Sequence, residues 1–133
     1  MIFGKATKRQ RCIAVVDDDA CTRMILRRCM ERAGHRVVEA ENGRALLGLL
    51  AVESLDLAIL GVYMPTLDGI QACRQLRKTT NGRLLPILFT TNVVDLETTA
   101  LCFDAGGNDL VHKPFQLQQL LVRVQDLLAG KPT

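Results

Sequence analysis

Short apolar runs alternate along the chain with longer segments in which apolar residues recur every three or four positions. The run Cys12–Val16 has no polar position, which is typical of a strand buried on both faces of a sheet. In the segment that follows, Ile25, Cys29 and Ala33 recur at four-residue intervals, and Gly34 stands just beyond them. This spacing predicts an amphipathic helix that ends at the glycine.

The same alternation of strand and helix occurs five times. The predicted strands cover residues 12–16, 36–39, 57–60, 85–90 and 110–112. The predicted helices cover residues 20–33, the surroundings of 46–50, 70–78, the segment from an N-cap at Asp95 to Gly106-Gly107, and an apolar stripe over 117–128. Such alternation forms a mainly parallel sheet with helices on both faces. The sequence therefore predicts one α/β domain at 11–130, preceded by a basic leader at 1–10.

Composition and charge narrow the class of protein. The 133 residues are 48% apolar and 23% charged, which is a globular composition. No apolar run is long enough to cross a bilayer, and the first residues do not resemble a secretory signal, so we expect a cytoplasmic protein without a membrane span. The net charge is +3. The first eleven residues carry +4, so the rest of the chain is slightly negative. Such a leader can bind nucleic acid or an anionic membrane surface, although a solvated extension is the commoner case, and no clear nucleic-acid-binding element is predicted.

The five cysteines are scattered without the spacing of metal ligands or a disulfide framework. We therefore predict small buried thiols at Cys12, Cys21, Cys29, Cys73 and Cys102.

Polar residues gather immediately after the predicted strands. Asp17, Asp18 and Asp19 follow the first strand, Thr91 follows the fourth and Lys113 the fifth. Because the carboxyl ends of parallel strands share one edge of a sheet, we expect these side chains to meet in one cleft. Adjacent carboxylates repel unless a cation lies nearby, and hard oxygen ligands suit Mg²⁺. The pattern suggests metal-assisted phosphoryl transfer onto a carboxylate. Asp19 is better placed as the N-cap of the first helix.

Four stretches, VVDDD, LDLAILGVYMPTLDG, PILFTTN and VHKPF, resemble the receiver domains of two-component response regulators in order and spacing. The resemblance covers roughly residues 11–129. It implies a flavodoxin-like fold, in which a five-stranded parallel sheet of order 2-1-3-4-5 carries five helices on its two faces. It also implies Mg²⁺ ligands at Asp17, Asp18 and the backbone carbonyl of Tyr63. Thr91 and Lys113 match the residues that contact the phosphoryl group.

The same resemblance implies a cis peptide bond between Lys113 and Pro114. His112, which precedes them, could be interpreted as a phosphohistidine, but no kinase-like motif surrounds it. We therefore expect an ordinary surface residue.

Gly61 stands where the resemblance places the phosphate-accepting aspartate, four residues before Pro65. Glycine also fits a tight strand end, but it has no carboxylate to accept phosphate or bind metal. By position, neither Asp56 nor Asp68 replaces it. Leu110 stands at the switch position, where many receivers carry Tyr or Phe. The resemblance thus implies a pseudo-receiver without a catalytic residue, which is not an enzyme and binds Mg²⁺ weakly at most.

We expect such a domain to act by phosphorylation-independent protein–protein interaction. The resemblance points to the face formed by the fourth helix, the last strand and the last helix. The alternative is an ordinary phospho-accepting receiver whose aspartate was lost by engineering or recent mutation, since the acidic pair, Thr91 and Lys113 remain. Without its usual partner, the Lys113 ammonium is expected to turn toward Asp17 and Asp18, because a partly buried charge needs a counter-charge.

Overall fold

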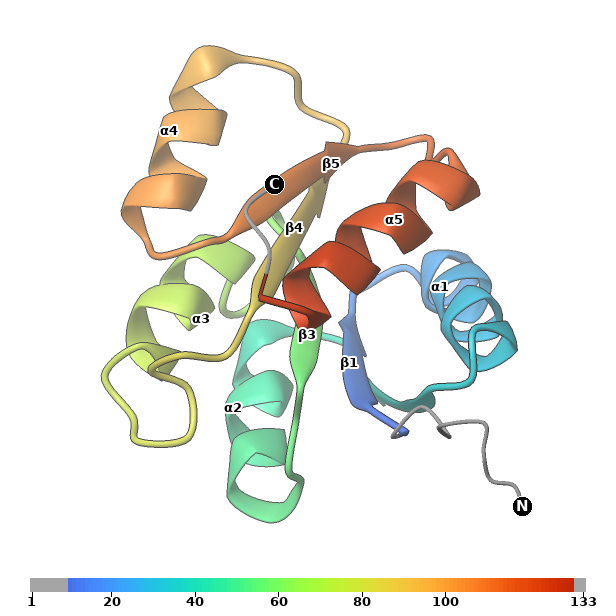
Figure 1. The fold of residues 1–133 in the computed structure, drawn as a ribbon. Helices are drawn as coiled ribbons and strands as arrows, with labels where there is room; N and C mark the ends of the chain where they lie inside the picture. The colour runs from blue at the N-terminus through green and yellow to red at the C-terminus, as the bar shows by residue number, and fades with distance from the viewer. Residues whose placement is uncertain (1–9, 131–133) are drawn as a thin grey trace, which may run out of the picture.

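The strands form a single parallel sheet. The computed structural model describes residues 10–130, so residues 1–9, which make up most of the predicted basic leader, lie outside the described part of the chain. The strand order is β2-β1-β3-β4-β5, and every neighbouring pair is parallel (Figure 1). The predicted sheet and its strand order are confirmed. The strands are β1 (Cys12–Val16), β2 (Arg36–Ala40), β3 (Leu57–Gly61), β4 (Ile87–Thr91) and β5 (Asp109–His112).

Five helices cover the two faces of this sheet, as predicted. They are α1 (Ala20–Arg32), α2 (Gly43–Val52), α3 (Gly69–Leu76), α4 (Leu96–Asp104) and α5 (Leu117–Leu128). α1 and α5 lie together on one face, and α2, α3 and α4 lie on the other (Figure 1). None of the helices within residues 10–130 is long and apolar enough to span a bilayer.

Each face of the sheet has its own hydrophobic core, and β1 contributes to both. Ala14 and Val16 point into the core beneath α2, α3 and α4, whereas Ile13 and Val15 point into the core beneath α1 and α5. Because successive side chains of a strand alternate between faces, both sets of positions must be apolar. This explains the uninterrupted apolar run with which β1 begins the domain.

The helix termini agree with the predicted start and stop signals. Asp19 and Asp95 are the N-caps of α1 and α4, and each accepts a hydrogen bond from a backbone N–H three residues later. Gly34 and Gly106 have φ of +94° and +108°, a conformation that glycine adopts without strain after a helix.

The predicted start of β4 was wrong by two residues. The strand begins at Ile87, because Pro86 has no N–H to donate to the sheet. The preceding carbonyl of Leu85 instead accepts a 2.7 Å hydrogen bond from Arg77. The same guanidinium donates to the carbonyls of Gly82 and Gly106, so it fixes the connection between α3 and β4 against the end of α4.

The prediction of buried thiols holds for four cysteines and is wrong for Cys21. That side chain is exposed because it lies on the outer side of the first turn of α1. His112 is exposed, as predicted.

Candidate functional site

The carboxyl ends of the strands lie uppermost in Figure 1, and the predicted site residues meet there. Asp17 directly follows β1, Gly61 ends β3, Thr91 ends β4 and Lys113 directly follows β5. The Lys113 Nζ lies 2.8 Å from Asp17 Oδ2. A Cβ built on Gly61 would lie 3.3 Å from the same carboxylate oxygen. The topology therefore brings Asp17, Gly61 and Lys113 into one cleft, as parallel α/β sheets commonly do at this edge.

Asp17 is a buried carboxylate with both oxygens engaged. Its residue is 1% exposed, its Oδ1 accepts a 2.8 Å hydrogen bond from the Asp19 N–H, and its Oδ2 pairs with Lys113. A carboxylate removed from water requires such partners. The prediction that Lys113 turns toward the acidic pair is confirmed, and the structure identifies Asp17 as its partner.

The other two aspartates after β1 have different surroundings. Asp18 is exposed and accepts no hydrogen bond from the residues that the structure describes. Asp19 accepts hydrogen bonds from the Thr22 hydroxyl at 2.6 Å and from the Thr22 N–H at 3.0 Å. These two bonds, that of the hydroxyl foremost, lower the pKa of the Asp19 carboxyl. Asp19 therefore caps α1, as predicted, and Asp17 is the carboxylate that contacts Lys113.

The cleft offers few side-chain ligands for Mg²⁺. Among residues 10–130, no group of three or more His, Cys, Asp or Glu side chains is arranged to hold a metal ion. Of the two predicted carboxylate ligands, Asp17 is already paired with Lys113 and Asp18 is exposed.

Thr91, at the predicted phosphoryl-contact position, and Leu110, at the predicted switch position, have different surroundings. Thr91 is 3% exposed, and its hydroxyl oxygen accepts a 3.1 Å hydrogen bond from the Val93 N–H. Its carbonyl accepts the Lys113 N–H at 2.9 Å, which aligns the ends of β4 and β5. Leu110 is 9% exposed and belongs to the core that contains Phe89 and Cys102. The Leu110 side chain therefore makes only apolar contacts. The predicted cis bond between Lys113 and Pro114 is present.

Sequence reasoning missed one contact at the rim of the cleft. The Tyr63 hydroxyl lies 2.8 Å from Thr98 Oγ1 in the first turn of α4. The prediction used only the backbone carbonyl of Tyr63, and a contact across 35 positions has no local sequence signal. The available signal was that Tyr63 is the chain's single tyrosine and stands two residues after Gly61.

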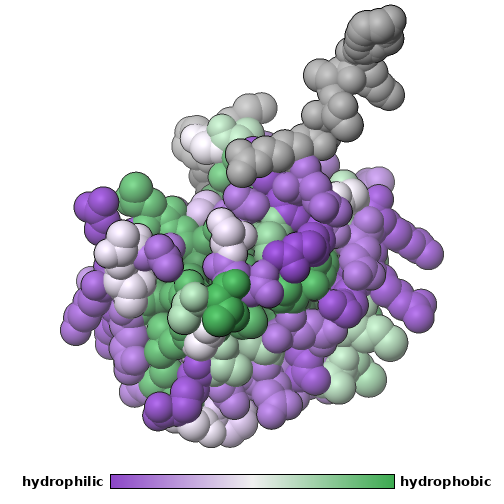
Figure 2. Space-filling view, turned by 90° about the horizontal axis from the view of Figure 1, so that it is seen from below, coloured by the Kyte–Doolittle hydropathy of each residue, from purple (hydrophilic) through white to green (hydrophobic). Residues whose placement is uncertain are grey.

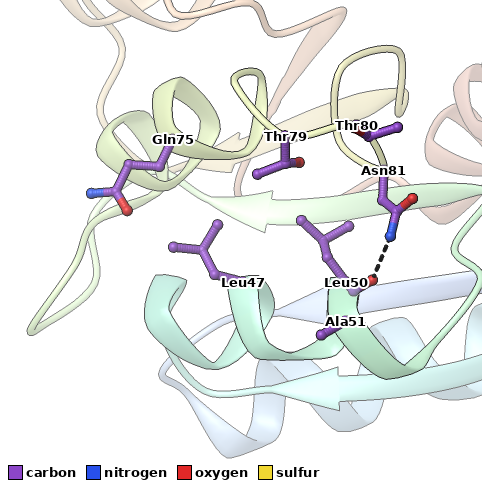
Figure 3. Close-up of a pocket in the computed structure, with 7 residues that line it drawn as sticks. All are labelled: Leu47, Leu50, Ala51, Gln75, Thr79, Thr80 and Asn81. Atoms are coloured by element: carbon purple, nitrogen blue, oxygen red, sulfur yellow. Dashed lines mark hydrogen bonds between the residues drawn. The ribbon is translucent and has the colours of Figure 1, made fainter.

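A hollow of the surface lies at the opposite end of the sheet. Figure 2 shows that end from below, with apolar side chains exposed among polar ones. A hollow of about 380 Å³ separates α2 from the segment that follows α3 (Figure 3). Asn81 closes it by donating a 3.1 Å hydrogen bond to the Leu50 carbonyl. Thr79 is likewise engaged, through the Leu76 carbonyl and the Gly82 N–H. These polar groups hold the loop in place and take no part in the cleft.

Comparison with known proteins agrees with this architecture. The sequence model of the response regulator receiver domain matches residues 13–125. Response regulator MprA of Mycolicibacterium vanbaalenii is 44% identical over 116 residues, which are 87% of this chain and 49% of that protein. MprA of Mycobacterium avium is 42% identical over 116 residues, with 87% and 50% covered. The chain thus spans about half the length of the curated relatives that it matches.

Solved structures share the fold. The signal receiver domain of a signal transduction histidine kinase from Syntrophus aciditrophicus has a TM-score of 0.84 and 28% identity, with 90% of this chain and 91% of that chain covered. The receiver domain of a sensor histidine kinase from Pseudomonas aeruginosa, solved with a magnesium ion in its active-site cleft, has a TM-score of 0.83 and 26% identity, with 92% and 100% covered. Because the matched residues run from Ile13 in β1 to Gln125 in α5 and include the whole cleft, the chain belongs to the response regulator receiver domain family.

Proposed function

We propose that this receiver domain signals by binding other proteins without accepting a phosphoryl group at the family's aspartate position. The observation that carries the proposal is Gly61 at the end of β3. A side chain at this position would start beside Asp17, inside the cleft, and glycine supplies no carboxylate there. A phosphoryl acceptor of the aspartyl type needs that carboxylate as its nucleophile. On this proposal, the domain works by association rather than by catalysis.

The ion pair between Lys113 and Asp17 supports the same conclusion. In a cleft with an acceptor aspartate, a lysine would have a carboxylate at position 61 to pair with. Here the ammonium pairs with Asp17 at 2.8 Å and neutralises the most buried charge of the cleft. The Lys113 ammonium thus provides, from within the chain, the positive charge that Mg²⁺ would otherwise bring to the cleft. We therefore propose weak Mg²⁺ binding at Asp17, Asp18 and the Tyr63 carbonyl.

The face formed by α4, β5 and α5 is the proposed site of protein interaction. Apolar side chains are exposed along its two helices. Exposed apolar surface of this kind commonly marks a site of protein interaction. β5 is joined to α5 by an ion pair of 2.7 Å between Asp109 and Arg123, so the strand and the helix form one surface. The exposed apolar residues are Leu96, Leu101, Phe103, Leu117 and Val122.

Treatment with a phosphodonor tests the proposal. Wild type and Gly61→Asp are incubated with acetyl phosphate and Mg²⁺, and intact mass spectrometry follows any added phosphoryl group. Wild type is expected to remain unmodified because it lacks the nucleophile. Ready modification of Gly61→Asp would show that Asp17, Thr91 and Lys113 remain competent, which favours recent or engineered loss of the aspartate. A stable phosphoryl group on wild type, mapped to Asp17, Asp18 or Asp68, would overturn the proposal.

A further inference from the structure

Tyr63 joins the rim of the cleft to α4. It lies in the connection between β3 and α3, and its hydroxyl is 2.8 Å from Thr98 Oγ1, an ordinary length for a hydrogen bond between hydroxyls. Thr98 is 3% exposed, whereas Tyr63 is 53% exposed, so the ring lies over the surface and its hydroxyl reaches inward. Within residues 10–130, this is the only hydrogen bond between the connection 62–68 and α4.

Thr98, the partner of Tyr63, also takes part in the N-terminal cap of α4. The Thr98 N–H donates a 2.7 Å hydrogen bond to Asp95 Oδ1, and Asp95 is the N-cap of the helix. Hydrogen bonds from the Thr98 N–H and then from its hydroxyl lower the pKa of the Asp95 carboxyl. Thr98 therefore contacts Tyr63 through its side chain and the N-cap Asp95 through its backbone N–H, which places the Tyr63 contact at the first turn of α4.

The connection that carries Tyr63 is fixed where it leaves the sheet. The Val62 N–H donates to the Thr90 carbonyl at 2.9 Å, and the Gly69 N–H donates to the Val62 carbonyl at 2.8 Å. A Cβ on Gly69 would lie 2.0 Å from the Gly61 carbonyl oxygen, so the start of α3 is in close contact with the strand end. The connection that carries Tyr63 is therefore held at its first residue, Val62, and at the start of α3.

Leu110, at the switch position, and Thr91 offer no comparable link. Leu110 has no polar atom in its side chain and is buried against the core. The Thr91 hydroxyl accepts the Val93 N–H in its own turn, and within residues 10–130 it makes no hydrogen bond to α4. Tyr63 is thus the side chain through which polar contact connects the cleft to this helix.

We propose that Tyr63 couples the acidic cleft to α4. A change of charge at position 61, or a cation at Asp18 and the Tyr63 carbonyl, displaces Tyr63, and the bond to Thr98 transmits that displacement to the helix. This inference rests on the proposed function, in which α4 is part of the partner-binding face. It identifies Tyr63 as the residue through which the cleft regulates the α4, β5 and α5 face.

The chain offers a direct assay, since it contains one tyrosine and no tryptophan. Labelling with 3-fluorotyrosine places a single ¹⁹F signal at Tyr63, and ¹H–¹⁵N spectra follow the amides of residues 96–104. The perturbation is Gly61→Asp, with and without Mg²⁺. It is expected to shift the ¹⁹F signal and the α4 amides. In a Tyr63→Phe background, which lacks one hydroxyl, Gly61→Asp is expected to shift the α4 amides less. The expected shift is below about a third of the shift that Gly61→Asp causes when Tyr63 is present. The amides beside Asp17 and Lys113 are expected to respond as before.

Two further variants separate coupling from general damage. Thr98→Val removes the partner hydroxyl with little change of shape and is expected to reproduce the effect of Tyr63→Phe. Thr99→Val is the matched control. Among the described residues, the Thr99 hydroxyl donates only to the Asp95 carbonyl, so its loss is expected to leave the response intact. Equal α4 shifts with and without the Tyr63 hydroxyl would overturn the coupling, as would an α4 that does not respond to Gly61→Asp. Phosphorylation of wild type would instead overturn the proposed function, so the two failures are distinguishable.

Discussion

Replacing Lys113 by alanine removes the only cation paired with Asp17 among residues 10–130. The carboxylate that remains is 1% exposed and retains the hydrogen bond from the Asp19 N–H. Breaking a fully buried pair costs about 3–5 kcal/mol, and losing an exposed pair costs about 1 kcal/mol or less. The Lys113 side chain is 28% exposed, so the cost lies between these limits. We expect Lys113→Ala to lower the free energy of unfolding by about 2 kcal/mol.

Thermal and urea unfolding followed by circular dichroism measure this loss. For a domain of this length, about 2 kcal/mol corresponds to a decrease in Tm of roughly 8 °C. Lys78→Ala is the matched control, because Lys78 is exposed and has no ion pair within the described residues; its effect should stay within about 0.5 kcal/mol. In an Asp17→Asn background no charge needs a partner, so Lys113→Ala should cost little there.

Added Mg²⁺ is expected to restore part of the lost stability in Lys113→Ala, because it binds the folded cleft in place of the ammonium. Wild type should gain less, since Lys113 already occupies that role. If Lys113→Ala is neutral and Mg²⁺ stabilises both proteins equally, the internal counter-ion explanation is refuted, and Lys113 contributes nothing to the charge balance of the cleft.

Three other predictions concern metal affinity, thiol reactivity and backbone contact. Calorimetric titration should show weaker Mg²⁺ binding by wild type than by Gly61→Asp, and equal affinity would place position 61 outside the metal site. With Ellman's reagent, Cys21 should react at once and the reaction should disappear in Cys21→Ser. The other four thiols should react only on unfolding, because burial raises their pKa, to about 11 for Cys102. Gly69→Ala should lower the free energy of unfolding by about 3 kcal/mol, since its Cβ would meet the Gly61 carbonyl; an unchanged urea midpoint would contradict that contact.

Much of the fold could be predicted because its signals are local or follow from general rules of topology. A buried strand such as β1 is apolar at every position, and a helix repeats its apolar positions every three or four residues. Strand and helix alternation then restricts the sheet to a parallel one with a shared functional edge. Hence Asp17, Gly61, Thr91 and Lys113 could be assigned to one cleft before their distances were known.

Other features depended on contacts between residues far apart in the chain. The sequence did not distinguish Asp17 from Asp18 as the partner of Lys113, and burial of Asp17 decides it. The bond from Tyr63 to Thr98 joins a loop to a helix across 35 positions, so it depends on how α4 lies over the sheet. Apolar periodicity reports only which face of an element is buried. The neighbour that each polar side chain meets is decided when the helices and loops come together over the sheet.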